Sequence, residues 1–245
     1  MEKRYIIGID QSTQGTKALL FDGVGHLLRR TDLPHRQIVN EKGWVSHDLN
    51  EIYRNTVQTV KTLVAESGVA PETIAGIGIS NQRETTAIWD KATGEPLEEA
   101  IVWQCGRASG IAQEIAEQGH AEEIREATGL QLSAYFPAAK MAWLLRNGGE
   151  ERQKRAADGK LCLGTIDSWL VYKLTGDHAF KTDFSNASRT QLFNLKTLAW
   201  DKKICEMFGI PVCALARVCN SDAVYGATTM EGLFSEPVPI CGVLG

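Results

Sequence analysis

The segment YIIGIDQSTQGTKALLF (residues 5–21) decides the fold. Its first part, Tyr5 to Ile9, is apolar and ends at Asp10, and its last part, Thr16 to Phe21, is apolar again. Apolar runs of this length, separated by a short polar loop, are typical of two neighbouring buried strands. The segment therefore predicts a pair of strands with a carboxylate where the first strand ends.

A third strand and a long helix follow this pair. After the turn at residues 22–25 a strand is expected at residues 26–30, so the chain opens as a three-stranded meander. Asp48 is suited to cap a helix, with Glu51 three residues later. The helix is expected to end at Gly68. Its apolar stripe consists of Tyr53, Val57, Val60 and Val64.

The remaining sequence mixes strands with helices. In the strand predicted at residues 73–80, Gly76 and Gly78 alternate with isoleucines, which lets another backbone or a ligand approach closely. A hairpin is predicted at residues 85–103. A mainly helical region follows at residues 107–174, with one strand inside it at residues 160–163, and a terminal strand is predicted at residues 238–244. This order predicts an α/β domain with a mixed sheet, and the opening meander argues against a simple doubly wound fold.

Composition narrows the class of protein. The chain has 245 residues, 43% of them hydrophobic, and a net charge of −4. This is enough apolar sequence for a sizeable core, and the charge gives no reason to expect a nucleic-acid partner. No segment has the anatomy of a signal peptide or the length of a membrane span. The six cysteines lack zinc-site spacing, so we expect a cytoplasmic protein with reduced thiols.

The loop of the opening segment is the first candidate site. A carboxylate such as Asp10, placed at a strand end, suits Mg²⁺. Loop amides, the Thr13 hydroxyl and the positive charge of Lys17 suit phosphate oxygens. The alternative is an ordinary turn in which Asp10 and Thr13 accept hydrogen bonds from turn amides. The loop is not a Walker A sequence, because no Gly-Lys-Ser/Thr follows at the required spacing.

Two further candidates lie downstream. Arg83 and Glu84 follow the glycine-containing strand, and ligands of α/β sheets bind outside such strand ends. Their donor fork and acceptor pair suit vicinal hydroxyl groups. The alternative is a surface turn with an exposed ion pair. Trp103 and Tyr135 could wall the carbon skeleton of a hydroxylated ligand, or else pack in the core.

Together these segments resemble the FGGY family of carbohydrate kinases, and within it the glycerol kinases. Residues 135–147, YFPAAKMAWLLRN, fit the first signature of that family at every restricted position. Further blocks stand in the same order as in glycerol kinases: GWVSHD (43–48), ISNQRET (79–85), IVWQ (101–104), GTIDSWL (164–170) and TDFSNASRT (182–190). The resemblance covers essentially the whole chain.

The resemblance implies a fold and a place in a larger enzyme. The family is built from two actin-like ATPase (ribonuclease H-like) lobes around a deep cleft. Residues 1–245 are expected to form the N-terminal, substrate-binding lobe, with a mixed sheet that opens in the meander and helices on both faces. The C-terminal nucleotide-binding lobe and the catalytic base are expected outside this chain, the base being an Asp directly after Gly245.

The resemblance also implies roles for individual residues. Arg83, Glu84 and Tyr135 match residues that hydrogen-bond the polyol, and Trp103 matches the residue that walls its carbon chain. Asp10 is expected to bind the magnesium ion that accompanies ATP. The ATP phosphates are assigned to the loop residues Thr13, Gln14, Gly15 and Lys17.

The implied reaction is transfer of the γ-phosphoryl group of ATP to a terminal hydroxyl of glycerol or a related small polyol or sugar. We expect the full-length enzyme to be a homo-oligomer with no membrane partner, and the isolated lobe to be inactive. Lys17 replaces an arginine of the glycerol kinase pattern, and Cys105 begins a second departure from it. A pentulose or other ketose kinase is therefore the alternative within the family. A non-catalytic polyol-binding module is the alternative from a different class of function.

Overall fold

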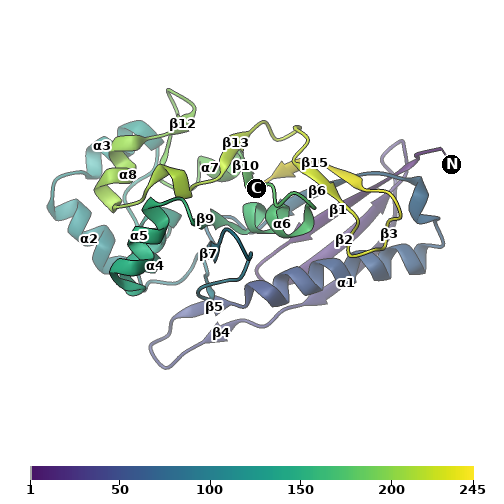
Figure 1. Ribbon diagram of the computed structural model, residues 1–245, viewed down its shortest axis with the longest axis horizontal. Coiled ribbons are helices and arrows are strands. Elements are labelled where there is room, and N and C mark those ends of the chain that lie inside the picture. The colour runs from purple at the N-terminus through teal and green to yellow at the C-terminus, as the bar shows by residue number, and fades with distance from the viewer. Residues whose placement is uncertain (1) are drawn as a thin grey trace.

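The computed structural model describes residues 2–245. Its main sheet has six strands in the order β14-β15-β6-β1-β2-β3 (Figure 1). In that order the strands span Gly226–Thr228, Val238–Leu244, Ile74–Asn81, Tyr5–Gln11, Gly15–Phe21 and Leu27–Pro34. β1, β2 and β3 are antiparallel neighbours, whereas β6 lies parallel to both β1 and β15. The predicted meander and mixed sheet are confirmed, with β3 continuing to Pro34.

A second, five-stranded sheet has the order β4-β5-β8-β7-β9. These strands span Ile38–Val39, Val45–His47, Ala100–Ile101, Thr86–Asp90 and Leu161–Thr165. β7 pairs antiparallel with both β8 and β9, which confirms the predicted hairpin and the strand predicted near residue 160. Two short ladders complete the strands: β10 (Lys181–Asp183) with β13 (Arg217–Cys219), and β11 (Phe193–Asn194) with β12 (Ala199–Trp200).

Glycine and proline residues mark the ends of several helices in the region predicted to be mainly helical. Pro137 is the first residue of α4, Gly129 ends α3 in the left-handed conformation with φ 72°, and Gly148 separates α4 from α5. Within residues 2–245 no helix is both long and apolar enough to cross a membrane. The helical bounds are α1 Leu49–Ser67, α2 Ser109–Glu117, α3 Ala121–Thr128, α4 Pro137–Asn147, α5 Gly149–Ala157, α6 Ile166–Leu174, α7 Phe184–Ala187 and α8 Lys202–Phe208, with 3₁₀ turns at Pro71–Thr73 and Val212–Ala214.

The long helix α1 has the predicted caps. The Asp48 carboxylate accepts hydrogen bonds from the backbone amides of Asn50 and Glu51, at 2.8 and 3.2 Å. Gly68 ends the helix with φ 70°. The Glu51 carboxylate, however, accepts from the amide of Arg36, so it does not complete a reciprocal capping box. The cap therefore ties the start of α1 to the segment that precedes it.

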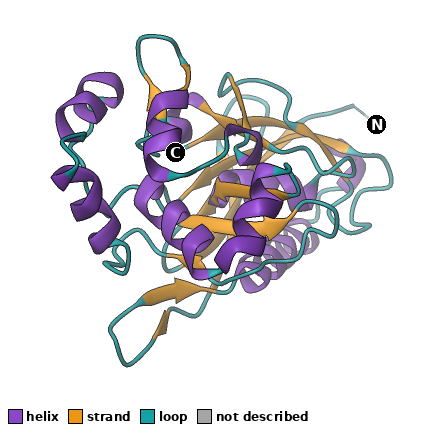
Figure 2. Ribbon diagram, turned by 60° about the vertical axis from the view of Figure 1, so that its left-hand side comes forward, coloured by secondary structure: helices purple, strands orange, loops and turns teal. Residues whose placement is uncertain are grey.

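Side chains that alternate between the two faces of each strand form two hydrophobic cores. In the six-stranded sheet Ile7 and Ile9 lie beside Ile77 and Ile79 on one face, where both α1 and α6 pack. The other face carries half-exposed residues, so the helices here cover one face of this sheet. In the second sheet Ala87 and Trp89 face this first core, while Ile88 faces a second core formed with α4 and α2. Helices thus lie on both faces of the second sheet (Figure 2).

The close approach predicted at the glycines of β6 is made at Gly76 by the side chain of Cys241 on the neighbouring strand β15. A methyl group added to Gly76 would lie 2.7 Å from Sγ of Cys241 on β15. Gly78 lies between its ladder partners Gly8 on β1 and Gly242 on β15. The glycines therefore let β15 pair closely with β6.

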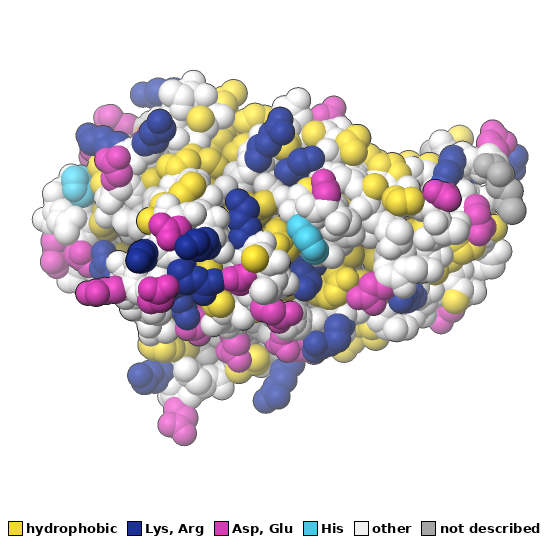
Figure 3. Space-filling view, viewed as in Figure 1, with side chains coloured by type: hydrophobic (Ala, Val, Ile, Leu, Met, Phe, Trp, Pro, Cys, Tyr) yellow, Lys and Arg dark blue, Asp and Glu magenta, His cyan; other side chains and the backbone are white. Residues whose placement is uncertain are grey.

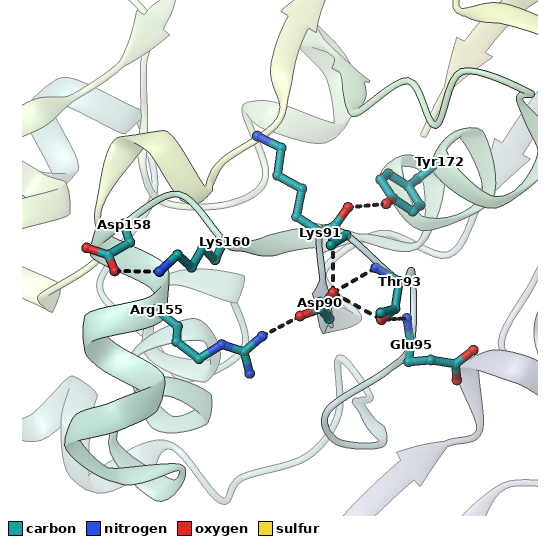
Figure 4. Close-up of polar contacts among 9 residues, drawn as sticks. Asp90, Lys91, Thr93, Glu95, Arg155, Asp158, Lys160 and Tyr172 are labelled. Atoms are coloured by element: carbon teal, nitrogen blue, oxygen red, sulfur yellow. Dashed lines mark hydrogen bonds and ion pairs between the residues drawn. The ribbon is translucent and has the colours of Figure 1, made fainter.

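The turn after β7 is held by neighbouring helices. The Asp90 carboxylate accepts from the amides of Ala92 and Thr93, at 2.8 and 2.7 Å, and forms an ion pair with Arg155 of α5 (Figure 4). Tyr172 of α6 donates its hydroxyl to the carbonyl of Lys91 at 2.6 Å. These contacts fix the second sheet between α5 and α6. On the face shown in Figure 3 acidic and basic side chains are interspersed.

Asp183 organises the chain around α7. Its fully buried carboxylate accepts from the amides of Ser185 and Asn186, and from the side chains of Ser185, Asn186 and Ser221. The Ser185 hydroxyl in turn accepts from the amide of Gly245 at 2.8 Å. The end of β15 is therefore anchored to this buried carboxylate.

His47, on β5, is a buried and neutral histidine. Burial, together with the neighbouring His35, lowers its pKa from 6.5 to about 4. The two rings lie 4.5 Å apart, edge to face. Nδ1 of His47 lies 3.2 Å from the carbonyl oxygen of Arg36, so Nδ1 carries the proton in the neutral ring.

We expect Asp183→Ala to lower the free energy of unfolding by at least about 3 kcal/mol, because several buried donors lose a charged acceptor. Asp201→Ala is the matched control, since Asp201 caps α8 but is partly exposed. Its expected loss is about 1 kcal/mol. Urea unfolding of both variants measures the difference, and equal losses would contradict the role given to Asp183.

We also expect His47 to make stability depend on pH. Its pKa is lowered in the folded state to about 4, so between pH 6.5 and pH 4 the unfolded chain binds more protons and stability falls as the pH falls. The full loss is roughly 3 kcal/mol. His47→Gln can still donate to Arg36 but does not titrate.

Urea unfolding of both proteins at pH 7 and pH 4 measures this term. The stability difference between wild type and His47→Gln should shift by roughly 3 kcal/mol in favour of the variant at the lower pH. Asp167, whose pKa burial raises to about 6, acts in the opposite direction but is common to both proteins and cancels. A pH-independent difference would show that His47 is not the titrating group.

Candidate active site

Three parallel strands bring the predicted residues to one edge of the main sheet. Asp10 on β1 lies beside Ser80 on β6, and Ser80 lies beside Leu244 on β15. The β1–β2 loop, the segment after β6 and Gly245 therefore leave the sheet together. This is the strand end at which ligands of α/β proteins bind.

The predicted phosphate loop is tied to the segment after β6. The turn is closed by Ser12, whose amide donates to the carbonyl of Gly15 at 2.9 Å. Gln82 donates from its side chain to Gln11 Oε1 at 3.0 Å and from its backbone to the Gln11 carbonyl at 2.6 Å. A methyl group at Gly15 would lie 2.5 Å from the Leu33 carbonyl oxygen, so pairing with β3 requires a glycine there.

Asp10 and Lys17 form an ion pair with each other. They are partners across the β1–β2 ladder, and Lys17 Nζ lies 2.7 Å from an Asp10 carboxylate oxygen. Both side chains are about one-third exposed. Gln14 is exposed. A hollow of about 350 Å³ opens beside the pair, lined by Ser12, Gln14, Gly15, Thr16, Lys17, Arg30, Asp32, Leu33 and Pro34.

One carboxylate at a strand end is compatible with magnesium. Mg²⁺ keeps several waters and is held through one or two carboxylates together with substrate phosphates. Among residues 2–245 no group of three or more His, Cys, Asp or Glu side chains forms a metal cage. Asp10, accessible to solvent and beside the loop amides, fits such a phosphate-dependent ion.

The predicted aromatic wall is present and is joined to the loop. The Trp103 and Tyr135 rings lie 5.7 Å apart, and Tyr135 is 39% exposed, so it is not a core residue. Trp103 donates its indole N–H to the Thr13 hydroxyl at 3.0 Å. Asp10 and Thr13 are thus engaged with Lys17 and Trp103 rather than with turn amides.

Arg83 and Glu84 have different surroundings. Glu84 is 4% exposed and has φ 62°, a left-handed conformation that is uncommon outside glycine. Its carboxylate pairs with Arg189 at 2.6 Å, so it is not half of an exposed turn pair with Arg83. Arg83 is exposed, and its aliphatic part packs against Gly245, where an added methyl group would lie 2.5 Å from Cδ.

Sequence reasoning missed two basic residues, Lys140 and Arg189, that contact the predicted substrate residues. Lys140, on α4, is fully buried and donates from Nζ to the Tyr135 carbonyl. Arg189 follows α7 and reaches Glu84. Lys140 lies within the signature at residues 135–147 and Arg189 within the block at residues 182–190, but neither segment shows from its own pattern that it meets residues 83–84.

The residues that depart from the glycerol kinase pattern also have defined contacts. Cys105 is buried and accepts from the amide of Val45 at 3.4 Å and from Arg107 Nε at 3.1 Å. The guanidinium of Arg107 donates to the Val45 carbonyl and the Ser46 hydroxyl and lies over the Trp44 ring. This part of the sequence therefore supports β5, next to the aromatic wall.

Known proteins with related sequences are glycerol kinases. The enzyme of Ligilactobacillus salivarius is 46% identical over 245 residues, covering 100% of this chain and 48% of the relative. Glycerol kinase 1 of Thermotoga maritima is 44% identical over 241 residues, covering 98% of this chain and 49% of the relative. The chain thus spans about half the length of the curated relatives it matches.

Solved structures show the same fold. Plasmodium falciparum glycerol kinase with ADP matches with a TM-score of 0.90 and 34% identity, covering 100% of this chain and 49% of that one. A ligand-bound xylulose kinase from Lactobacillus acidophilus, at 24% identity, has a TM-score of 0.84 over 98% of this chain and 48% of that one. The lobe therefore has the actin-like ATPase fold expected from the resemblance.

A family model supplies the remaining comparison. The N-terminal domain of the FGGY family of carbohydrate kinases matches residues 5–245, which is nearly the entire chain. The expected resemblance is confirmed, and this chain belongs to the FGGY family of carbohydrate kinases.

Proposed function

We propose that this chain is the substrate-binding lobe of an ATP-dependent kinase that phosphorylates a terminal hydroxyl of glycerol or a related small polyol. The observation that carries the proposal is the meeting of an aromatic wall, a buried carboxylate and a solvent-facing arginine beside a polar loop at one sheet edge. Identity of 44–46% with glycerol kinases supports this substrate class. The nucleotide-binding lobe belongs to the part of the protein beyond this chain.

The polyol is bound on two sides. Trp103 and Tyr135 contact its carbon chain, Arg83 and the Tyr135 hydroxyl donate to hydroxyl oxygens, and Glu84 accepts from a hydroxyl. A small polyol needs both kinds of contact, because its carbons are apolar and its oxygens require hydrogen bonds. The exposed edge of Tyr135 and the solvent-facing guanidinium of Arg83 leave both groups accessible to a ligand.

The loop side serves the phosphates. Lys17 and the amides of Thr13, Gln14 and Gly15 would stabilise phosphate charge, and Asp10 would hold a magnesium ion through its carboxylate or the waters of the ion. Magnesium, when bound, offsets the charge that develops on the transferred phosphoryl group. Lys17 already neutralises Asp10 at 2.7 Å, so phosphate binding must share that cation.

The general base follows β15. In the complete protein we place it directly after Gly245, whose backbone lies against Arg83 and is held by Ser185. A carboxylate at that position would be next to the hydroxyl bound by Arg83 and could accept its proton as the phosphoryl group is transferred.

The function is tested with the complete protein and with the 245-residue chain in parallel. ADP release is measured with a panel of glycerol, other small polyols, pentuloses and other ketoses. We expect the complete protein to turn over glycerol or a close relative. The isolated chain should show less than about a hundredth of that rate, because it lacks the base and lobe closure.

The outcomes of this panel test the substrate class, the catalytic function and the position of the base separately. Preference for a ketose would move the substrate to the pentulose class. Absence of turnover with every member would leave a non-catalytic polyol-binding module as the function. Turnover by the isolated chain near the rate of the complete protein would show that the base lies within residues 1–245.

Arg83→Ala in the complete protein should raise the polyol KM about tenfold or more, because a bound hydroxyl loses a charged donor worth about 1.5–3 kcal/mol. The KM for ATP should stay within about twofold. Arg29→Ala, which removes an exposed arginine paired with Glu66, is the control. An unchanged polyol KM in the Arg83 variant would show that Arg83 is an ordinary residue of a surface turn and does not bind the polyol.

A further inference from the structure

The carboxylate of Glu84 depends on a partner from a distant segment. Glu84 is 4% exposed, and burial of a carboxylate is unfavourable unless the charge is paired and hydrogen-bonded. Its backbone, at φ 62°, is in a region that persists only when the surroundings support it. The cation that pairs with it is Arg189, whose Nε donates to Oε1 at 2.6 Å.

Arg189 is itself held in place. Its guanidinium lies 5.0 Å from the centre of the Phe136 ring, and Phe136 is in edge-to-face contact with Tyr135. The carbonyl of the next residue, Thr190, accepts from the amide of Ala138 in the first turn of α4 at 2.9 Å. The segment that carries Arg189 is thus joined to the start of the helix that follows Tyr135.

Lys140, on α4, contacts another residue of the proposed polyol site, Tyr135. Its buried ammonium donates to the Tyr135 carbonyl and lies 5.9 Å from the Tyr135 ring centre. Burial lowers its pKa to about 7, whereas the negative charge of Glu84 acts in the opposite direction. Arg189 and Lys140 therefore contact Glu84 and Tyr135, respectively, which we assign to polyol binding.

We propose that Arg189 is a positioning residue for polyol recognition, which holds Oε1 of Glu84 so that Oε2 faces the substrate as a hydrogen-bond acceptor. This inference rests on the proposed function. Among the residues that the structure describes, no hydrogen bond reaches Oε2 of Glu84. Arg189 acts through Glu84 and does not touch the substrate.

The guanidinium suits this role better than an ammonium. It is planar, always charged, and can stack on Phe136 while one nitrogen bonds the carboxylate. Arg189→Lys should keep the charge but lose the stacked geometry, so it should retain part of the function. Arg189→Met keeps the length and apolar contact with Phe136 but removes the donor.

The test uses the complete kinase with wild-type sequence, Arg189→Met, Arg189→Lys and the control Arg146→Met. Arg146 forms a comparable ion pair with Glu114 at 2.6 Å, but both side chains are nearly half exposed, and the pair joins the C-terminal end of α4 to α2. Arg189→Met should raise the glycerol KM about tenfold or more, with Arg189→Lys in between. The KM for ATP and both constants of the control should remain within about twofold.

Deoxy analogues separate positioning from general damage. Glycerol is compared with 1,2-propanediol and 1,3-propanediol, each of which lacks one hydroxyl. In wild type, the diol that lacks the hydroxyl bound by Glu84 should be used much less well than glycerol, because Oε2 is left unpaired. In Arg189→Met that discrimination should fall by about tenfold, to the level of Glu84→Gln.

A general structural defect would raise the KM for all three compounds alike and leave their ratios unchanged, and that result would overturn the proposal. If Arg189→Met does not fold, wild-type ratios in Arg189→Lys with an unchanged glycerol KM would also overturn it. A wild-type enzyme that uses polyols, with unaltered variants, contradicts only the role of Arg189. A wild-type enzyme that uses no polyol contradicts the proposed function itself, and this inference with it.

Discussion

The parallel pairing of β6 with β1 on one side and β15 on the other determines where every functional group of this lobe can lie. Because parallel strands end at the same edge, Asp10, Ser80 and Leu244 are neighbours although they are far apart in the sequence. The loop after β1 and the segment after β6 then contact each other through Gln82. The second sheet and its helices add the aromatic wall from outside this edge.

Buried charge is the second organising feature. Glu84, Lys140 and Asp183 are all removed from water. Glu84 and Asp183 are hydrogen-bonded to segments distant in the sequence, whereas Lys140 donates to the carbonyl of Tyr135, five residues before it. Replacing such a group together with its partners would change the stability little, because the loss of hydration offsets the pairing, whereas removing one partner alone is costly. These buried charged side chains do restrict how the surrounding segments can pack, because each has very few hydrogen-bond partners within reach. Glu84 is itself a predicted substrate residue, Lys140 donates to the carbonyl of Tyr135, and Asp183 holds the amide of Gly245 through Ser185.

Much of the fold could be predicted from local sequence, whereas much of the site could not. The strands of the meander and the Asp48 and Gly68 caps follow from alternation, apolar runs and capping chemistry within a few residues. Arg189 lies 105 positions from Glu84, and no periodicity links them. The reach of Trp103 to Thr13 and the packing of Arg83 on Gly245 likewise depend on tertiary structure. Local pattern and family resemblance both indicated Arg83, Glu84, Trp103 and Tyr135 as candidates, but neither supplied the contacts that hold them.

The strand β7 belongs to both cores, since Ala87 and Trp89 face one and Ile88 the other. Pulling the helical part away from the six-stranded sheet would therefore expose apolar side chains on both sides of one strand at once, which is costly. If β7 shifted its pairing by a single residue, Ala87 and Trp89 would face the second core and Ile88 would face the first. We infer that the lobe moves as one rigid body. If the proposed function holds, a hinge used by the complete kinase would lie at the boundary of this lobe, and the pocket proposed for the polyol would keep its shape while the hinge moves.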